Sequence, residues 1–236
     1  MTDFQFPEKP TVEIIDVMGS DASIVRAARV SLSGENSVDE WGTKEEGLIN
    51  YLLKNKHGSP FEHTALTFYV KAPIFVFREF HRHRIGFSYN EISGRYSKLN
   101  PEFYVPADDR PLVNVGTSAK PQMAPADPGT VEAVQDILRD NALRAWENYE
   151  ILLGLGIANE VARAVLPVNI MSQMYVTCNA RSLMNFLTLR TQDENAAHVS
   201  RPQYEIQQVA RDMEDIFALE FPTTYRSYQE NKRVAP

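Results

Sequence analysis

The sequence contains little cysteine and fewer basic than acidic residues, and each shortage excludes a class of protein. Cys178 is the only cysteine among 236 residues, which excludes a disulfide framework, a cysteine zinc site and a CxxC redox pair. The 24 Lys and Arg residues against 31 Asp and Glu residues give a formal net charge of −7. We therefore expect no general nucleic-acid binder, because such proteins neutralise phosphates with a broad basic face.

Long apolar runs are also missing. No stretch of about 18 apolar residues occurs, as a membrane-spanning helix would need. Residues 1–10 lack a basic segment followed by an apolar run, so the sequence predicts no secretory leader and no membrane partner. We expect a cytoplasmic protein. With 43% hydrophobic residues, the chain can bury one large core, and we expect a single domain over residues 1–236.

The pattern of apolar residues predicts alternating strands and helices. Strands are expected over Thr11–Met18 and Ala65–Val70. Helices are expected over Asp21–Leu32, after a cap at Thr43, after Pro73, from a cap at Thr130 to Leu153, over Arg181–Arg190, and finally over Gln203–Leu219. Val168–Thr177 fits either a strand or a helix, and the proline-rich stretch Ala107–Pro128 is expected to be a surface loop. The apolar stripe on the helix that starts near Thr130 predicts core or subunit interface.

The most informative stretch is RHRIGFSYNEISGRYS, which runs from Arg82 to Ser97. Its arginines and its histidine lie close together and repel one another, which costs stability unless an anionic group neutralises them. A phosphate, a carboxylate or a flavin pyrophosphate would do so. Gly86 and Gly94 mark positions where the backbone could approach such a ligand closely.

The remaining histidines and the cysteine have simpler interpretations. The pairs His57 with His63 and His81 with His83 do not complete a metal-ligand set, because no cysteine or acidic trio joins them. We therefore expect no metal. Cys178 lies in an apolar stretch, where a buried, unreactive thiol is the usual outcome, so we expect no covalent catalysis by this cysteine.

Three blocks of sequence resemble the flavin-dependent thymidylate synthase family, and they occur in that family's order. The block Arg82–Arg95 is similar to the family signature of RHR, seven residues, then S, any residue and R. Here eight residues separate Arg84 from Ser93, and we expect the extra residue to be accommodated near Gly86. The block His57–Phe80 resembles the segment that leads into the signature, and Ala162–Arg190 resembles the second half of the family sequence.

The resemblance implies an α+β fold, in which a central, mostly antiparallel or mixed sheet is flanked by long helices. It also implies a homotetramer with sites where subunits meet. The implied reaction is the reductive methylation of dUMP to dTMP, with methylenetetrahydrofolate as one-carbon donor and NADPH as reductant of a bound FAD. Carbon 5 of uracil is a poor nucleophile until negative charge develops in the ring, so a fixed cation beside it lowers the barrier. The family's arginine for this role matches Arg190.

The resemblance assigns ligand-binding residues at matching positions. For FAD these are Ser59, Arg82, His83, Arg84, Glu91, Asn179, Arg181 and Asn185. For dUMP they are Glu79, Arg82, Glu91, Ser93, Gly94, Arg95, Arg163 and Arg190. Glu79 stands where the family has a glutamine, and a carboxylate beside a phosphate is repulsive unless it faces the ribose or pairs with an arginine.

Two other interpretations stay open. A nucleotide- or flavin-binding regulatory protein would tolerate the loss of Arg190 or of the Ser93-Gly94-Arg95 run, and all four residues are present. An RNA-contacting protein would use the Arg78–Arg95 patch, with its aromatic side chains as stacking surfaces. The acidic balance elsewhere disfavours the RNA interpretation, and such binding would weaken steeply with salt.

Overall fold

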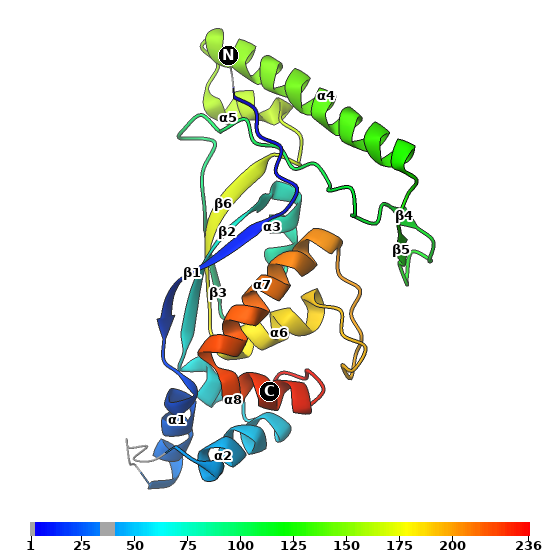
Figure 1. Cartoon of the computed structure of the whole chain (residues 1–236). Coiled ribbons are helices and arrows are strands. Elements are labelled where there is room, and N and C mark those ends of the chain that lie inside the picture. Colours follow the sequence, from blue (N-terminus) through cyan, green and yellow to red (C-terminus); the bar gives the residue numbers. More distant parts are fainter. Residues whose placement is uncertain (1–2, 34–40) are drawn as a thin grey trace. The chain divides into compact units, whose positions relative to one another are not determined.

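The computed structural model describes residues 3–33 and 41–236 and divides into two compact units (Figure 1). Each unit is assembled from several stretches of the sequence. Unit 1 comprises Met1–Pro10, Lys71–Phe80 and Glu91–Met174, and unit 2 comprises Thr11–Val70, His81–Asn90 and Tyr175–Pro236. The single domain expected over residues 1–236 stays a prediction.

Within the described residues, a four-stranded sheet has the strand order β1-β2-β6-β3. Its strands are β1 (Thr11–Met18), β2 (Ala65–Pro73), β3 (Phe87–Glu91) and β6 (Met171–Cys178). Along most of β2 and β6, buried residues alternate with more exposed ones. This period of two is the pattern of a strand with one face against a core. The segment that fitted either a strand or a helix is therefore a strand.

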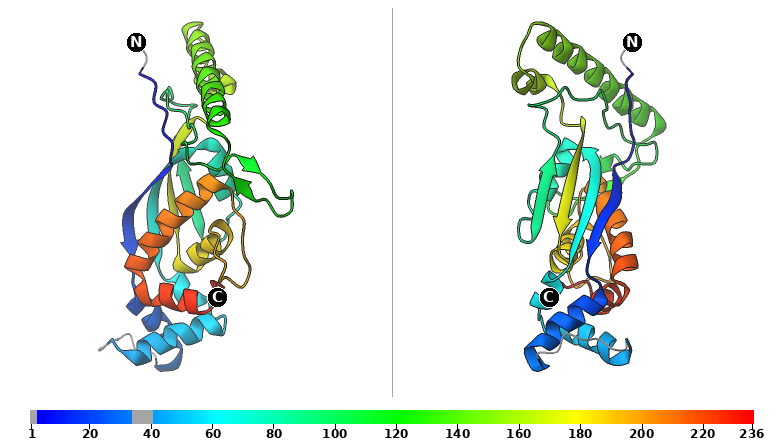
Figure 2. Two further views of the ribbon diagram at one scale, coloured as in Figure 1. Left: turned by 45° about the vertical axis from the view of Figure 1, so that its right-hand side comes forward. Right: turned by 90° about the vertical axis from the view of Figure 1, so that its left-hand side faces the viewer.

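Unit 2 contains several helices in addition to its part of the sheet. They are α1 (Asp21–Ser33), α2 (Thr43–Lys54), η1 (Ser59–Glu62), α6 (Ala180–Arg190), α7 (Tyr204–Glu220) and α8 (Pro222–Glu230). Helices α6 and α7 lie side by side on one face of the sheet, with α7 against β1 (Figures 1 and 2). Helix α8 packs on α1 and α2, which closes the core of this unit around side chains such as Phe217 and Tyr228.

The observed helix caps correct two predictions. Helix α2 is capped by Gly42 rather than Thr43, and its Glu45 carboxylate accepts from the Gly42 N–H at 3.0 Å. Helix α4 (Pro128–Gly154) is capped by Asp127 rather than Thr130, and the Asp127 carboxylate accepts from the Thr130 N–H at 3.0 Å. In both helices the observed cap precedes the predicted one, so Thr43 and Thr130 lie inside the first turn.

Helix α8 corrects the prediction that the chain's last helix ends near Leu219. It begins at Pro222, which suits a first helical turn because its missing N–H would have no partner there. Its N-terminus is capped from a distant part of the chain: the buried Asp21 carboxylate accepts from the Thr223 N–H at 2.8 Å and from the Thr224 N–H at 3.0 Å. A carboxylate beside these N–H groups also favours the helix dipole.

Unit 1 contains one long helix and several short elements. They are α3 (Ile74–Phe80), β4 (Val113–Asn114), β5 (Met123–Ala124), α4, α5 (Asn159–Ala162) and η2 (Arg163–Val165). The expected loop Ala107–Pro128 is confirmed apart from β4 and β5, which pair antiparallel with Val113 opposite Ala124 and Asn114 opposite Met123. Helix α4 packs against α5 and η2.

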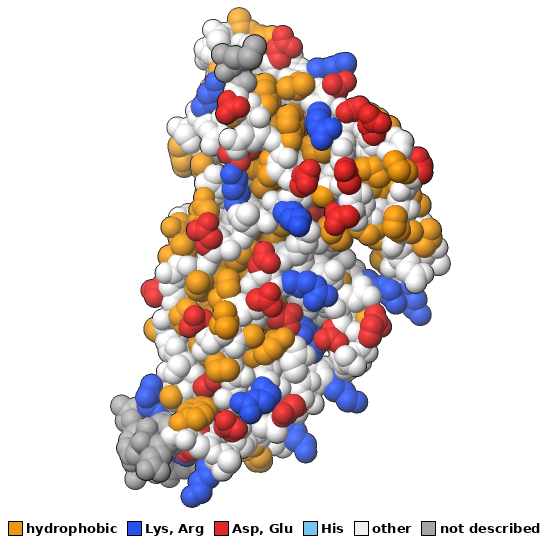
Figure 3. Space-filling model, viewed as in Figure 1, with side chains coloured by type: hydrophobic (Ala, Val, Ile, Leu, Met, Phe, Trp, Pro, Cys, Tyr) orange, Lys and Arg blue, Asp and Glu red, His pale blue; other side chains and the backbone are white. Residues whose placement is uncertain are grey.

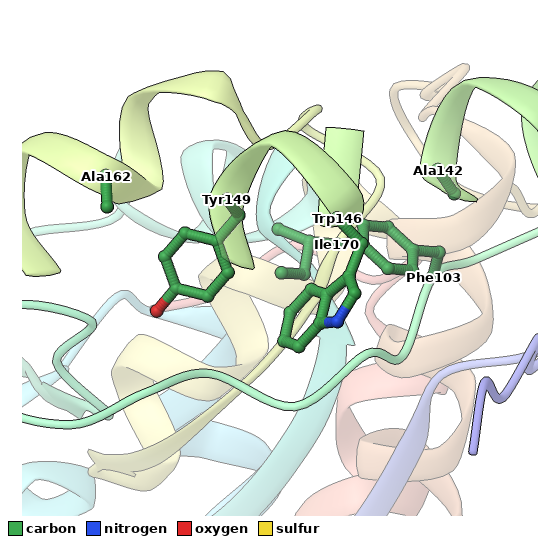
Figure 4. Close-up of a cluster of buried hydrophobic side chains, with 6 residues drawn as sticks. All are labelled: Phe103, Ala142, Trp146, Tyr149, Ala162 and Ile170. Atoms are coloured by element: carbon green, nitrogen blue, oxygen red, sulfur yellow. The ribbon is translucent and has the colours of Figure 1, made fainter. Parts of the chain in front are cut away.

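An aromatic cluster forms the core of unit 1 against α4 (Figure 4). Its buried members are Phe103, Ala142, Trp146, Tyr149, Ala162 and Ile170. The Trp146 ring meets Phe103 edge-on, with centroids 6.2 Å apart, and lies 5.1 Å from the Tyr149 ring. Such edge contacts are favourable because a ring's positive edge faces a negative face. The predicted stripe on α4 is only partly buried, since Ile137 and Leu143 are exposed.

Charged side chains of both signs are interspersed over the face of the molecule shown in Figure 3. Among the described helices, none has the length and apolarity that crossing a bilayer requires.

Replacing Trp146 with alanine should strongly destabilise unit 1, because a large-to-small change in a packed core costs about 3–5 kcal/mol. We expect urea unfolding, followed by circular dichroism, to show this loss for Trp146→Ala. The matched control Ile137→Ala lies on the same helix with 67% of the residue exposed and should change the free energy of unfolding by less than about 0.5 kcal/mol. Equal losses in the two variants would contradict the assignment of the cluster as core.

Candidate active site

Unit 2 contains a cavity of about 650 Å³ beside the RHR motif. Its lining consists of Arg82, His83, Arg84, Ile85, Phe87, Arg181, Ser182 and Asn185. Residues 82–87 come from the segment that leads into β3, and the others come from the first turns of α6. The volume lies within the range of small-molecule sites. The fold thus joins two of the three sequence blocks at one cavity.

Gly86 allows the RHR segment to approach α6. Its φ of +69° lies in the left-handed region that favours glycine. A Cβ at this position would lie 2.1 Å from the Ser182 Oγ and 2.8 Å from the Asn179 Nδ2, which leaves no room for a side chain. Ser182 Oγ instead donates to the Ile85 carbonyl at 2.9 Å. The place where the extra residue of the signature was expected is therefore a turn that requires glycine.

The start of α6 fixes two of the predicted flavin contacts. Asn179 caps the helix by accepting from the Ser182 N–H at 2.8 Å. Arg181 donates from Nε to the Pro236 carbonyl at 2.8 Å and from Nη1 to the Glu62 carboxylate at 2.6 Å. A Cβ on Gly58, the residue before Ser59, would lie 2.5 Å from Arg181 Nε. Ser59 therefore lies near Arg181, although Ser59, Asn179 and Arg190 are outside the described lining.

A hydrogen bond joins His83 to Arg190, with Arg190 Nε donating to His83 Nε2 at 3.0 Å. Burial, and to a lesser extent the positive charge of Arg190, lowers the pKa of His83 from 6.5 to about 4. The imidazole is therefore neutral at pH 7, with Nε2 as the acceptor. Its ring packs edge-on against Phe186, 4.9 Å away. Because the acceptor is neutral, this bond orients the Arg190 guanidinium without cancelling its charge.

Unit 1 gathers several residues that were expected to bind dUMP. The Ser93 Oγ accepts from the Arg95 N–H at 3.3 Å, and Arg95 Nε donates to the Glu160 carboxylate at 3.0 Å. A Cβ on Gly94 would lie 3.3 Å from Arg163 Cδ. Ser93, Gly94, Arg95 and Arg163 therefore form one group, although Arg163 lies in a different sequence block.

The two glutamates that were predicted to bind dUMP have different surroundings. Glu91 accepts from the Ser172 Oγ at 2.6 Å, so a strand neighbour on β6 orients its carboxylate. Glu79 is partly buried on α3. The sequence alone does not reveal Ser172 as the partner of Glu91, or Glu62 as the partner of Arg181. Neither residue carries a local signal, because each contact depends on chain segments far apart in sequence.

Cys178 is buried, with 2% exposure, as the sequence predicted. Burial raises the pKa of its thiol, which disfavours the reactive thiolate. In the described ranges, no three His, Cys, Asp or Glu side chains lie close enough together to hold a metal ion.

Comparison with known proteins identifies the family. Residues 13–223 match the family described as "Thymidylate synthase complementing protein". A flavin-dependent thymidylate synthase from Streptomyces avermitilis is 50% identical over 234 residues, which cover 98% of this chain and 95% of that relative. The chain belongs to the flavin-dependent thymidylate synthase family. The family predicted from the three sequence blocks is therefore confirmed.

Two solved structures share the fold of this chain. Both are of the UMP/dUMP methylase PolB from Streptomyces cacaoi, bound with 5-Br UMP in one and with 5-Br dUMP in the other, and both give a TM-score of 0.92. Their identities are 41% and 43%, over 99% of this chain and 99% and 100% of PolB. The predicted α+β fold and the assignment as an enzyme are confirmed, while the roles of individual residues stay predictions.

The lowered pKa of His83 predicts a pH dependence of stability. Unfolding restores a pKa near 6.5, so below this pH the unfolded chain takes up a proton that the folded chain refuses until about pH 4. The free energy of unfolding should therefore fall as the pH falls through this window, by at most about 1.4 kcal/mol per pH unit from this group. Urea titrations from pH 7 to pH 4 should show a steeper fall for the wild type than for His83→Asn, which cannot titrate here. If stability falls equally with pH in the wild type and in His83→Asn, His83 is not the group that causes the pH dependence.

Proposed function

We propose that this protein is a flavin-dependent thymidylate synthase that converts dUMP to dTMP. The observation that carries the proposal is the cavity of unit 2, where Arg82, Arg84 and Arg181 meet a neutral His83 that holds Arg190. Cationic groups of this density suit an anionic ligand. The membership of the chain in the family makes a flavin and a nucleotide the relevant anions.

The cavity residues fit FAD by their chemistry. The guanidinium groups of Arg82, Arg84 and Arg181 would pair with the pyrophosphate or the ring oxygens of the flavin. Ile85 and Phe87 add apolar surface to the lining, and Asn185 adds an amide. Ser59, Asn179 and Glu91 complete the proposed set by their match to the family. When bound, the flavin supplies the hydride for the reaction.

We assign the dUMP phosphate to the group of Ser93, Gly94, Arg95 and Arg163 in unit 1. Arg95 and Glu160 are each about half exposed, with 53% and 52% of their side chains accessible. An exposed ion pair contributes only about 0–1 kcal/mol, so a dianionic phosphate can replace Glu160 at little cost. Serine hydroxyl, glycine N–H and arginine fork together make a phosphate-binding set. Glu91, oriented by Ser172, and Glu79 would face the sugar side of the nucleotide.

In the proposed reaction, the methylene carbon of methylenetetrahydrofolate bonds to carbon 5 of dUMP, and carbon 5 loses its proton. The two bonds from the methylene carbon to the folate nitrogens break, and these nitrogens take up protons. A hydride then completes the methyl group, which yields dTMP and tetrahydrofolate, while NADPH is oxidised to NADP⁺ to renew the reductant. Arg190 would stabilise the negative charge that develops in the uracil ring, and the neutral His83 that accepts its hydrogen bond brings no opposing charge. The burial of Cys178 supports a route without an enzyme thiolate.

The proposal includes a cytoplasmic homotetramer with its sites where subunits meet. The exposed apolar side chains of Ile137, Leu143 and Ile151 along α4 support an assembly, because a subunit interface would remove such surface from water.

The similarity to PolB favours a second candidate substrate. That protein is named a methylase of both UMP and dUMP, and it is 41% and 43% identical to this chain in its two structures. Methylation of UMP, whose ribose carries an additional 2′-hydroxyl, is therefore the alternative reaction.

The activity itself is the first measurement. Protein supplied with FAD should show flavin absorbance, and anaerobic NADPH should bleach it faster when dUMP is present. With methylenetetrahydrofolate added, we expect one dTMP for each NADPH oxidised, and a parallel assay with UMP decides between the two substrates. A protein that takes up FAD but methylates neither nucleotide would support the regulatory interpretation, and one that refuses FAD would contradict both.

Arg190→Ala should keep its bound flavin and lose most dTMP formation. We expect a decrease of about 10²–10³-fold in kcat, the usual effect of removing one preorganised group that stabilises developing charge. Arg226→Ala is the matched control, since Arg226 is 55% exposed and pairs only loosely with Glu46 at 3.5 Å. Turnover by Arg190→Ala close to that of the control would remove Arg190 from the chemistry.

A further inference from the structure

The segment Lys232–Pro236, here called the strap, contacts both ends of α6. Near the end of the helix, the Thr188 Oγ1 donates to the Arg233 carbonyl at 2.7 Å. Near its start, Arg181 Nε donates to the Pro236 carbonyl at 2.8 Å. Helix α6 carries Arg181 in its first turn and Arg190 as its last residue. The strap therefore spans the helix that supplies two arginines of the proposed site.

Arg233 is a buried cation whose partners lie next to Arg190. Only 4% of its side chain is exposed. Its guanidinium donates to both carboxylate oxygens of Glu214 and to the hydroxyl of Thr191, and the Asp193 carboxylate lies 3.7 Å away. Thr191 is the C-cap of α6 and directly follows Arg190. A single side chain thus links the strap and α7 to the residue that ends α6.

The backbone of the strap is held in an unfavourable conformation. Lys232 and Arg233 have φ angles of 54° and 58°, in the left-handed region where side chains other than glycine are strained. Such residues persist only when the surrounding structure fixes them. Here the Arg233 N–H donates to the Tyr228 carbonyl and the Ala197 N–H donates to the Lys232 carbonyl, both at 2.9 Å.

Stability alone gives a weak reason for this arrangement. A buried ion pair such as Arg233 with Glu214 is often no more stabilising than well-packed apolar residues of the same size. Its advantage is directional, because a planar guanidinium fixes several acceptors in one geometry at once. The acceptors here are Thr191 at the end of α6 and Glu214 on the neighbouring helix α7. Arg233 therefore fixes the position of the end of α6 relative to α7.

We propose that the strap positions the two arginines of α6 for the reaction. Arg233 fixes the end of α6 through Thr191 and so sets the place of Arg190 beside His83, while the Pro236 carbonyl orients the Arg181 guanidinium toward the cavity. Arg233 and Thr191 are positioning residues, because they act through Arg190. This inference rests on the proposed function: its activity readout rests on the proposed reaction, and its flavin readout rests on the FAD site proposed for the cavity of unit 2.

The test compares two replacements of Thr191. Thr191→Val keeps the shape and loses the hydroxyl that accepts from Arg233, whereas Thr191→Ser keeps the hydroxyl. At saturating dUMP we expect kcat for dTMP formation to fall about 10- to 100-fold in the valine variant and to stay within about twofold of wild type in the serine variant. Thermal unfolding gives the folded fraction of each variant at the assay temperature, and each measured kcat is divided by this fraction. A valine variant with the kcat of the wild type would overturn the proposal.

A second variant keeps the proposal testable if Thr191→Val does not fold. Arg233→Lys retains the positive charge beside Glu214 but loses the fork that also reaches Thr191, and Arg226→Lys is its matched control on α8. We expect the FAD dissociation constant, measured by flavin fluorescence, to rise about tenfold in Arg233→Lys and to stay unchanged in the control, because Arg181 depends on the strap. Equal constants would overturn the proposal. The FAD dissociation constants can be compared even if the wild type forms no dTMP. That outcome would reject the proposed reaction, and the role of the strap would still be tested by FAD binding.

Discussion

The hydrogen bond from Arg190 to a neutral His83 is the interaction on which the site in unit 2 depends. A protonated imidazole could not accept it and would place a second positive charge 3.0 Å from the Arg190 Nε. Burial against aromatic rings keeps the imidazole neutral. The contacts that hold His83 in place therefore also determine the charge next to Arg190. Tyr89 donates to the His83 carbonyl at 2.7 Å, and Gly86 lets the whole segment lie against α6.

The family signature is continuous in sequence but is divided between the two units. Its RHR part and the following residues up to Asn90 belong to unit 2, whereas Glu91 to Arg95 belong to unit 1. The residues proposed to hold the flavin lie mainly in unit 2, and those proposed to hold the nucleotide lie mainly in unit 1. A short motif can therefore contribute residues to both proposed ligand sites, because the chain passes from unit 2 to unit 1 between Asn90 and Glu91.

Much of this organisation could be predicted from the sequence, since it depends on local patterns. The strands Thr11–Met18 and Ala65–Val70 and the helix Arg181–Arg190 follow from periodicity and agree with β1, β2 and α6 to within a few residues. The resemblance to the family rested on three blocks of local sequence, and it identified the residues that line the cavity at 82–84, 181 and 185.

The features that the sequence did not reveal depend on contacts between distant residues. Helix α8 begins with Pro222, but the carboxylate that accepts from its first N–H groups belongs to Asp21, about 200 residues earlier in the chain. The partners Glu62 for Arg181 and Ser172 for Glu91 are likewise set by the fold alone. The misplaced caps at Thr43 and Thr130 have a different cause, because several residues near a helix start can each act as a cap, and geometry selects among them.

The distribution of tryptophan gives each unit its own fluorescent reporter. The chain has two tryptophans, Trp41 in unit 2 and Trp146 in unit 1. Trp146 is 2% exposed in the aromatic cluster, whereas Trp41 is 43% exposed. An indole in an apolar core emits at shorter wavelength than one in contact with water, so the blue side of the emission band reports on unit 1 and the red side on unit 2. The two units can thus be followed separately in one unlabelled sample.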